Sequence, residues 1–261
     1  MYIGIICEFD PLHTGHAWLM ARARAAGASA VVCAMSGNFT QRGSFAALDK
    51  RARAEMAVRC GADLVVELPT VWAMSPAETF ARGGVQLLAL TGADTLLFGS
   101  ECGELSALRR LADCLDSPAF ADRLTAADSG ATFAVRRQRT AAALLGDADA
   151  ALLESPNNTL AVEYLRALRR TGTAVVAGLH AVLPAAGHVG GQRVADDDAF
   201  LRRQERGAPL VQLCERPVKE RRRGLGRAQT LRDEEPVEIP LHPRQLQPVE
   251  LLVIGAVAGH S

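Results

Sequence analysis

One segment near the start sets the architecture of this chain: Gly4-Ile5-Ile6-Cys7-Glu8-Phe9-Asp10-Pro11-Leu12-His13-Thr14-Gly15-His16. The apolar residues 3–7 predict a strand that runs into a proline turn, and a helix is predicted to begin near His16. Open α/β sheets bind ligands just beyond the carboxyl ends of their strands. A ligand site is therefore expected directly after this first strand.

Two histidines dominate the chemistry of that segment. His13 and His16 are three residues apart, with Gly15 between them. They can present imidazole N–H groups along one side of a helix start, where free helix N–H groups point the same way. Gly15 would let the backbone approach a ligand without a Cβ clash. We therefore predict that both histidines are catalytic and act on a nucleoside triphosphate by positioning and charge stabilisation, without a protein nucleophile.

Two other interpretations fit the His-x-Gly-His pattern taken alone. It can be a surface turn with two solvated histidines, or a pair of zinc ligands at helical spacing. The position directly after the first predicted strand favours the nucleotide site over both.

Composition narrows the class of protein. The 261 residues are 49% hydrophobic and carry no net charge, which fits one α/β domain plus a smaller part. The sequence shows neither a secretory signal nor a transmembrane run, so we expect a cytoplasmic protein without a membrane partner. Zero net charge gives no global signature for nucleic acid, and no DNA partner is expected, although arginine clusters could form a local basic face.

The cysteines do not follow a metal or disulfide pattern. No Cys-x-x-Cys pair occurs, so no metal site is predicted and free thiols are expected. The six are Cys7, Cys33, Cys60, Cys102, Cys114 and Cys214.

Strand and helix signals alternate through the first two thirds of the chain. This alternation predicts an α/β fold with a doubly wound parallel sheet. Strands are expected at 3–7, 29–35, 63–69, 94–98 and 174–177. Helices are expected from about 16, at 52–60, 76–90, 105–153 with an interruption near 129–130, and 159–170.

Further polar clusters fall near the ends of predicted strands. The loop 36–43 holds Asn38, Gln41 and Arg42, a set suited to anionic oxygens, and an ordinary solvated loop is the alternative. Gly99 could admit an adenine or ribose against the backbone. The Asn157-Asn158 pair lies after a proline, where a plain helix cap is the alternative. Lys50 could reach a phosphate or simply begin a solvated helix.

Six motifs in register carry a resemblance to a known family. The chain resembles the tRNA(Met) cytidine acetate ligase family over residues 1 to about 180. The motifs are Glu8-Phe9-Asp10-Pro11-Leu12-His13-Thr14-Gly15-His16, Met35-Ser36-Gly37-Asn38-Phe39-x-Gln41-Arg42-Gly43, Asp49-Lys50-x-x-Arg53-Ala54-Glu55-Met56, Asp63-Leu64-Val65-x-Glu67-Leu68-Pro69, Phe98-Gly99-Ser100-Glu101 and Pro156-Asn157-Asn158-x-Leu160. The departures are mild: Asp10, Leu12 and Thr14 stand where the family usually has Asn, Phe and Asn.

The resemblance implies a Rossmann-like nucleotidyltransferase domain that uses ATP, with Mg²⁺ as counter-ion, to activate acetate as acetyl-adenylate. The acetyl group would pass to N4 of the wobble cytidine of elongator methionine tRNA, releasing AMP. Acetate or tRNA contacts are assigned to Asn38, Gln41, Arg42 and Lys50. The implied ATP contacts are Ile6, Cys7, Glu8, Phe9, Asp10, Pro11, Leu12, His13, Thr14, Gly15, His16, Ala17, Trp18, Leu19, Gly99 and Asn157 or Asn158.

Beyond residue 180 no continuation of the family is recognised. Residues 181–261 contain one aromatic residue, Phe200, with charge runs and scattered prolines, and only 249–257 is strongly apolar. This composition predicts a poorly packed C-terminal segment after an ATP-binding domain at 1–180, in a truncated or frame-shifted relative.

Three functional classes therefore compete. The first is the acetate ligase. The second is another adenylyl-transferring enzyme with a small-molecule acceptor, since the two histidines alone do not define the acceptor. The third is a catalytically impaired remnant or RNA-binding module.

Overall fold

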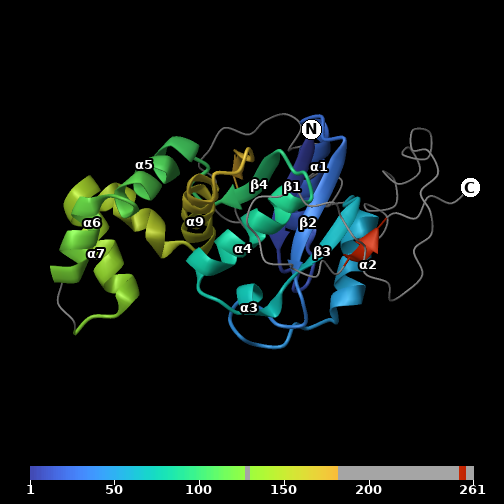
Figure 1. Cartoon of the computed structure of the whole chain (residues 1–261), viewed down its shortest axis with the longest axis horizontal. Coiled ribbons are helices and arrows are strands. Elements are labelled where there is room, and N and C mark those ends of the chain that lie inside the picture. The colour runs from blue at the N-terminus through green and yellow to red at the C-terminus, as the bar shows by residue number, and fades with distance from the viewer. Residues whose placement is uncertain (127–129, 182–252, 257–261) are drawn as a thin grey trace, which may run out of the picture.

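The structure, a computed structural model, describes residues 1–126, 130–181 and 253–256. Its centre is a six-stranded sheet in the order β5-β4-β1-β2-β3-β6 (Figure 1). Five strands are parallel, and β6 pairs antiparallel with β3. The strands are β1 (Tyr2–Cys7), β2 (Ala30–Ser36), β3 (Leu64–Leu68), β4 (Thr95–Ser100), β5 (Val176–Ala181) and β6 (Val253–Ala256).

The predicted doubly wound sheet is confirmed for the five parallel strands. From β1 the chain adds β2 and β3 on one side and then β4 and β5 on the other. The direction of winding therefore changes between β1 and β4. Such a switch point opens a crevice at the carboxyl ends of the two strands, where ligands bind in this class of sheet.

The edge strand β6 is the described part of the C-terminal segment beyond residue 181. Its residues come from the segment expected to be poorly packed, yet Gly255 pairs with Val65 and Ala256 with Leu64. An apolar run can satisfy the open hydrogen-bonding edge of β3 even when its flanks are polar. The remainder of that expectation, at 182–252 and 257–261, lies outside the described residues.

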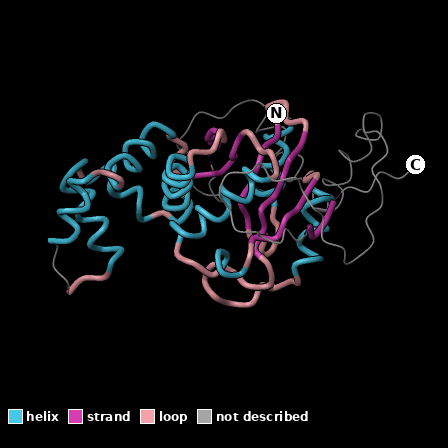
Figure 2. The backbone as a smooth tube through the Cα atoms, viewed as in Figure 1, coloured by secondary structure: helices cyan, strands magenta, loops and turns pink. Residues whose placement is uncertain are grey.

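Helices cover both faces of the sheet (Figure 2). Helices α1 and α2 lie on one face, and α4 and α9 on the other. The described helices are α1 (Thr14–Ala25), α2 (Lys50–Cys60), α3 (Thr70–Ala73), α4 (Ala77–Leu90), α5 (Leu105–Leu115), α6 (Pro118–Ala126), α7 (Phe133–Leu145), α8 (Asp147–Ala150), the 3₁₀ turn η1 (Ala151–Glu154) and α9 (Pro156–Thr171).

Strand β1 divides its side chains between the two cores. Ile3, Ile5 and Cys7 pack toward α1 and α2. On the opposite face, a Cβ at Gly4 would lie 2.6 Å from Leu88 of α4. The absence of a side chain at Gly4 therefore lets α4 lie directly on the central strand, which fixes the strand end that carries the histidine motif.

Several element boundaries differ from the sequence-based prediction. Helix α1 begins at Thr14 because His13 caps it, and α2 begins at Lys50 because the Asp49 carboxylate accepts the N–H groups of residues 51 and 52. Strand β5 extends to Ala181, beyond the predicted 174–177. The long helical region breaks into α5 to α8 and η1, and the short α3 was not predicted.

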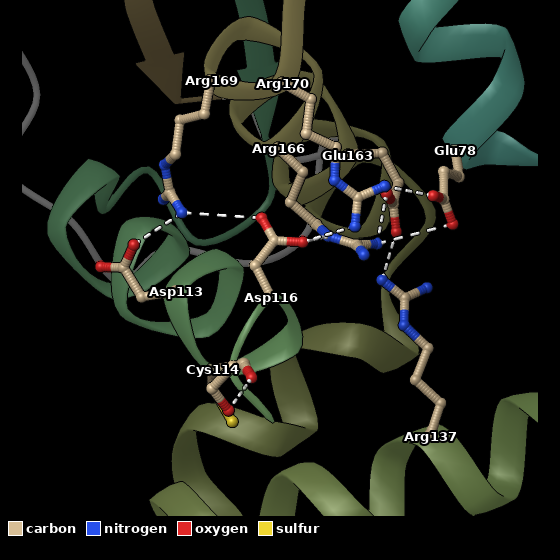
Figure 3. Close-up of polar contacts among 10 residues, drawn as sticks. Glu78, Asp113, Cys114, Asp116, Arg137, Glu163, Arg166, Arg169 and Arg170 are labelled. Atoms are coloured by element: carbon tan, nitrogen blue, oxygen red, sulfur yellow. Dashed lines mark hydrogen bonds and ion pairs between the residues drawn. The ribbon is translucent and has the colours of Figure 1, made fainter. Parts of the chain in front are cut away.

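The helices α5 to α8 form a lobe beside the sheet, joined to it through α9 (Figure 1). An ion-pair network holds this joint (Figure 3). The Glu163 side chain is 2% exposed and accepts from Arg137 of α7 and, at 2.8 Å, from Arg166. Asp116 accepts from Arg166 at 2.8 Å and from Arg170 at 2.6 Å. Burial raises the pKa of Asp116, but the two arginines outweigh it and the net shift is downward.

The cysteine expectation is corrected at one position. Cys60 is disulfide-bonded, which contradicts the prediction of free thiols, whereas Cys7, Cys33, Cys102 and Cys114 are free.

Within the part of the chain that the structure describes, no helix is both long enough and apolar enough to cross a membrane.

Candidate active site

The histidine motif and two other predicted clusters meet at the switch point. The motif follows β1, and Gly99 and Glu101 lie at the end of β4, the neighbouring strand. The N-terminus of α9 is tied to the same corner, because the side-chain amide oxygen of Asn158 (Oδ1) accepts the N–H of Cys102 at 3.1 Å. Three segments that are far apart in sequence thus frame one corner of the sheet.

His13 and His16 form a reciprocal cap at the start of α1. The Nδ1 atom of His13 accepts the N–H of Gly15 at 3.1 Å, and Nδ1 of His16 accepts the N–H of His13 at 3.3 Å. The two rings stack with centroids 3.7 Å apart. Because Nδ1 is an acceptor in both rings, each neutral imidazole carries its proton on Nε2. Both side chains can therefore donate one N–H to a ligand.

Burial keeps both imidazoles neutral. It lowers the pKa of His13, and it lowers the pKa of His16 to about 4, with the charge of His13 adding to the effect. At neutral pH the pair therefore acts as hydrogen-bond donors and not as two cations. A bound polyanion would favour the protonated forms, so ligand binding and protonation are linked at this site.

Three of the N–H groups in the first turn of α1 are already hydrogen-bonded, whereas free N–H groups were expected there. The N–H of Gly15 is bonded to the His13 side chain, and those of His16 and Ala17 are bonded to the His13 carbonyl oxygen at 3.0 and 3.1 Å. A Cβ at Gly15 would lie 3.0 Å from the His13 ring. A side chain at position 15 would therefore crowd the His13 ring. A bound phosphate would have to compete with His13 Nδ1 for the N–H of Gly15.

The acidic residues of the first motif bind the loop that follows β2. A Glu8 carboxylate oxygen accepts the N–H of Gln41 at 2.5 Å, and an Asp10 carboxylate oxygen accepts the N–H of Ala47 at 2.6 Å. Between them Phe9 is 1% exposed and has a φ of 51°, a left-handed backbone that a bulky residue adopts only when packing fixes it. These contacts join the loop rigidly to the histidine motif.

The structure places the other predicted contact residues in two ways. Gln41 and Arg42 line a surface depression with residues 74–77. Asn38 and Lys50 take part in local structure. The side-chain amide oxygen of Asn38 (Oδ1) accepts the backbone N–H of Lys50 at 2.9 Å, and the Lys50 ammonium lies 2.6 Å from Glu67. Roles for these four residues toward substrate remain predictions.

The two asparagines at α9 have different environments. Asn158 is 2% exposed, and its side chain is used to hold Cys102. Asn157 is exposed, and its backbone and side-chain N–H groups donate to Glu101 at 3.1 and 3.0 Å. Asn157 is therefore the member of the pair that a ligand can reach, and the Glu101 carboxylate already occupies the N-terminus of α9.

Arg53 supports the site and was missed as a functional residue. Its side chain is fully buried and donates to four backbone carbonyls: Leu48 at 3.0 Å, Glu8 at 2.5 Å, Ser36 at 3.2 Å, and Gly37. It thereby ties together the ends of β1 and β2. One feature of the sequence could have indicated this role: Arg53 stands among alanines on the predicted helix. Two of these alanines, Ala54 and Ala57, face the core.

The lowered histidine pKa values predict a pH-dependent stability. The unfolded chain binds protons to histidine near pH 6.5, whereas folded His16 binds one only near pH 4. Between these values the unfolded state holds more protons, so stability should fall as pH falls from about 6.5 toward 4. The urea midpoint should drop less from pH 7 to pH 5 in His16→Gln, which keeps the cap acceptor, than in the original chain. Equal drops in both proteins would contradict the assignment.

Comparison with known proteins identifies relatives. A family model described as HIGH Nucleotidyl Transferase matches residues 1–177. The tRNA(Met) cytidine acetate ligase of Syntrophotalea carbinolica is 44% identical over 83% of this chain and 54% of its own length. The enzyme of the same name from Caldanaerobacter subterraneus is 42% identical over 67% of this chain and 45% of its own.

A solved structure agrees with these sequences. The crystal structure of Thermotoga maritima TmcAL bound with alpha-thio ATP superposes with a TM-score of 0.67 and 29% identity, covering 84% of this chain and 56% of that one.

The extent of the matches bears on the C-terminal segment. The match to the Syntrophotalea protein covers a larger share of the chain than residues 1–180 contain, so the similarity continues past residue 180, where sequence reasoning recognised none. The chain spans about half the length of the relatives it matches. Since the family model spans residues 1–177, the chain belongs to the HIGH nucleotidyl transferase family.

Proposed function

We propose that this chain activates acetate with ATP to form acetyl-adenylate and transfers the acetyl group to N4 of the wobble cytidine of elongator methionine tRNA. The observation that carries the proposal is the stacked His13–His16 pair at the switch point, which keeps an Nε2 donor on each ring. The names of the relatives supply the substrates, and the alpha-thio ATP bound to the Thermotoga protein supplies the nucleotide.

The nucleophiles of this reaction belong to the substrates, so the protein has to position them and stabilise charge. An acetate oxygen attacks the α-phosphorus of ATP, and the bond to the bridging oxygen breaks as pyrophosphate leaves. The cytidine N4 amine then attacks the acetyl carbon, AMP leaves with the bonding electrons, and the amine loses a proton to solvent. Donors fixed at the β- and γ-phosphates stabilise the charge that builds up on the leaving pyrophosphate.

The arrangement of residues at the switch point supports the following roles toward ATP. His13 and His16 donate from Nε2 to the β- and γ-phosphates, and the backbone at Gly99 lies against the adenosine, with Asn157 as the reachable amide. Among the described residues no group of three or more His, Cys, Asp or Glu side chains could hold a metal ion. Mg²⁺ usually keeps several waters and binds substrate phosphates, so it would accompany ATP as the counter-ion of its phosphates.

An exchange assay separates the three functional classes. The chain is incubated with ATP and labelled pyrophosphate, with or without acetate, and label in ATP is measured. Exchange that depends on acetate, followed by acetylation of elongator methionine tRNA, supports the ligase. Exchange with a different carboxylic or phosphorylated substrate supports another adenylyl-transferring enzyme. No exchange with any substrate, together with retained tRNA binding, supports an RNA-binding remnant.

Arg42 is expected to contact the acceptor more than ATP. It is exposed at the tip of the loop that Glu8 and Asp10 tie to the histidine motif. If it binds an RNA phosphate, Arg42→Ala should weaken tRNA binding and reduce the slope of log affinity against log salt by about one unit. If it binds acetate, the acetate KM should rise while tRNA affinity stays intact.

The matched control for Arg42 is Arg59→Ala. Arg59 is an exposed arginine on α2 that pairs with Glu55, so its loss removes the same charge elsewhere. Should Arg42→Ala behave like Arg59→Ala in both measurements, the loop has a structural role only.

A further inference from the structure

The loop after β2 is a small, well-formed hairpin. Phe39 and Phe45 form an antiparallel bridge, and the Ala46 N–H donates to the Asn38 carbonyl at 3.0 Å. At the tip, the Gly43 N–H donates to the Thr40 carbonyl at 2.9 Å, and the φ of Gly43 is +79°, which favours glycine. The turn leaves Gln41 and Arg42 at its apex.

This hairpin exposes an aromatic ring. Phe45 is 77% exposed, and its centroid lies 4.8 Å from that of Phe39. The exposed large apolar residues of the adjoining segments are Leu48, Val71 and Met74, and the Met74 methyl group lies 4.0 Å from the Cβ position of Gly43. Phe45 therefore presents an exposed aromatic face on the hairpin, backed by the ring of Phe39.

A depression lies where the hairpin meets the start of α4. Its volume is about 420 Å³, and it is lined by Gln41, Arg42 and residues 74–77. The depression is shallow and largely open to solvent. The lining contains one cation and no carboxylate. The backbone N–H of Gln41 is held by Glu8, and its side-chain amide still offers both a donor and an acceptor.

We propose that this hairpin surface, made of Phe45, Gln41, Arg42 and residues 74–77, docks one unstacked nucleotide of the acceptor RNA. The base stacks on Phe45, the Gln41 amide meets its polar edge, and the Arg42 guanidinium binds a flanking phosphate. Single-stranded RNA is recognised by this combination of an aromatic platform, amide contacts to base edges and basic groups. The inference rests on the proposed function, because it assumes that RNA is the acceptor.

The position of the surface suits an acceptor. Two carboxylates of the histidine motif hold the hairpin at Gln41 and Ala47, and Arg53 holds the strand end from which it starts. A nucleotide on the hairpin surface would therefore keep a fixed relation to the site of adenylate formation. The single cation Arg42, in a lining without carboxylates, also favours an anionic partner such as a phosphate over a basic one.

The test combines variants of Phe45 with changes in the RNA. Dissociation constants are measured for the whole chain and the anticodon stem-loop of elongator methionine tRNA, either intact or with an abasic residue at the target cytidine or at either neighbour. Phe45→Ala should weaken binding of the intact RNA about 5- to 150-fold, the range for losing one base–aromatic stack. Phe45→Tyr should restore most of the affinity. With one of the abasic RNAs, Phe45→Ala should cause no further loss, because the stack is already missing.

The matched control is Phe133→Ala, which removes a ring that is 60% exposed on α7. Equal RNA affinity in Phe45→Ala and Phe133→Ala would overturn the inference, and so would an equal loss with all three abasic RNAs. Exchange activity of the unmodified chain separates this result from the proposed function. Acetate-dependent exchange together with RNA binding that does not depend on Phe45 overturns the docking surface alone. RNA binding that depends on Phe45, without exchange, upholds the surface and contradicts the proposed catalysis.

Discussion

Replacing His16 by alanine is expected to lower the rate of acetyl-adenylate formation by about 10²- to 10³-fold, the scale of losing one preorganised donor. His13→Ala should have a similar effect. The reason is that both rings present Nε2–H while Nδ1 is held by a backbone N–H, so the donors need no reorganisation as charge builds up on pyrophosphate. ATP affinity should fall much less. Single-turnover formation of acetyl-adenylate measures the rate directly.

The cap at the start of α1 needs a control, because alanine also removes a capping acceptor worth about 0.5–2 kcal/mol. His13→Asn keeps an N-cap acceptor and removes the imidazole donor. This variant should retain the urea midpoint and lose the rate. If His16→Ala and His13→Asn both form acetyl-adenylate at the original rate, the histidines only cap the helix.

The sequence predicted the sheet because its signals are local. Apolar strands, a glycine after α2 and alternating helices all lie within short windows, and the connection rules then leave few possible topologies. The position of Gly99 beside the end of β1 also followed, since neighbouring parallel strands end at the same edge, whereas Asn157 is brought there by the contacts of α9 with Glu101 and Cys102. Boundaries moved by a few residues where side chains of His13 and Asp49 act as caps.

What sequence reasoning missed depends on contacts between distant residues. Strand β6 forms because β3 has an open hydrogen-bonding edge. A short apolar run in the sequence does not indicate which strand edge it will pair with. The carboxylates of Glu8 and Asp10 sit within a nucleotide motif, yet their partners are backbone N–H groups of a hairpin more than thirty residues away. The role of Arg53 is equally non-local, since its acceptors lie just after β1, at the end of β2 and in the loop before α2.

Replacing Arg53 by methionine is expected to destabilise the fold by more than about 3 kcal/mol. The guanidinium is fully buried and serves four backbone carbonyls, and each hydrogen bond to a charged donor contributes about 1.5–3 kcal/mol. Methionine fills similar space but leaves these acceptors unpaired away from water. Urea unfolding measures the loss, with Arg59→Ala on the same helix as control, which should stay within about 0.5 kcal/mol of the original chain.

Arg53→Lys tests whether geometry or charge matters at this position. Lysine keeps the charge, but its single ammonium cannot reach acceptors spread over Leu48, Glu8 and Gly37 as a planar fork does. Its stability should therefore lie between those of Arg53→Met and the original chain. Because Arg53 fixes the backbone of Glu8, just before the histidine motif, adenylate formation by folded Arg53→Lys should also slow. An unchanged rate at reduced stability would confine Arg53 to packing, and unchanged stability in Arg53→Met would remove it from the architecture of the site altogether.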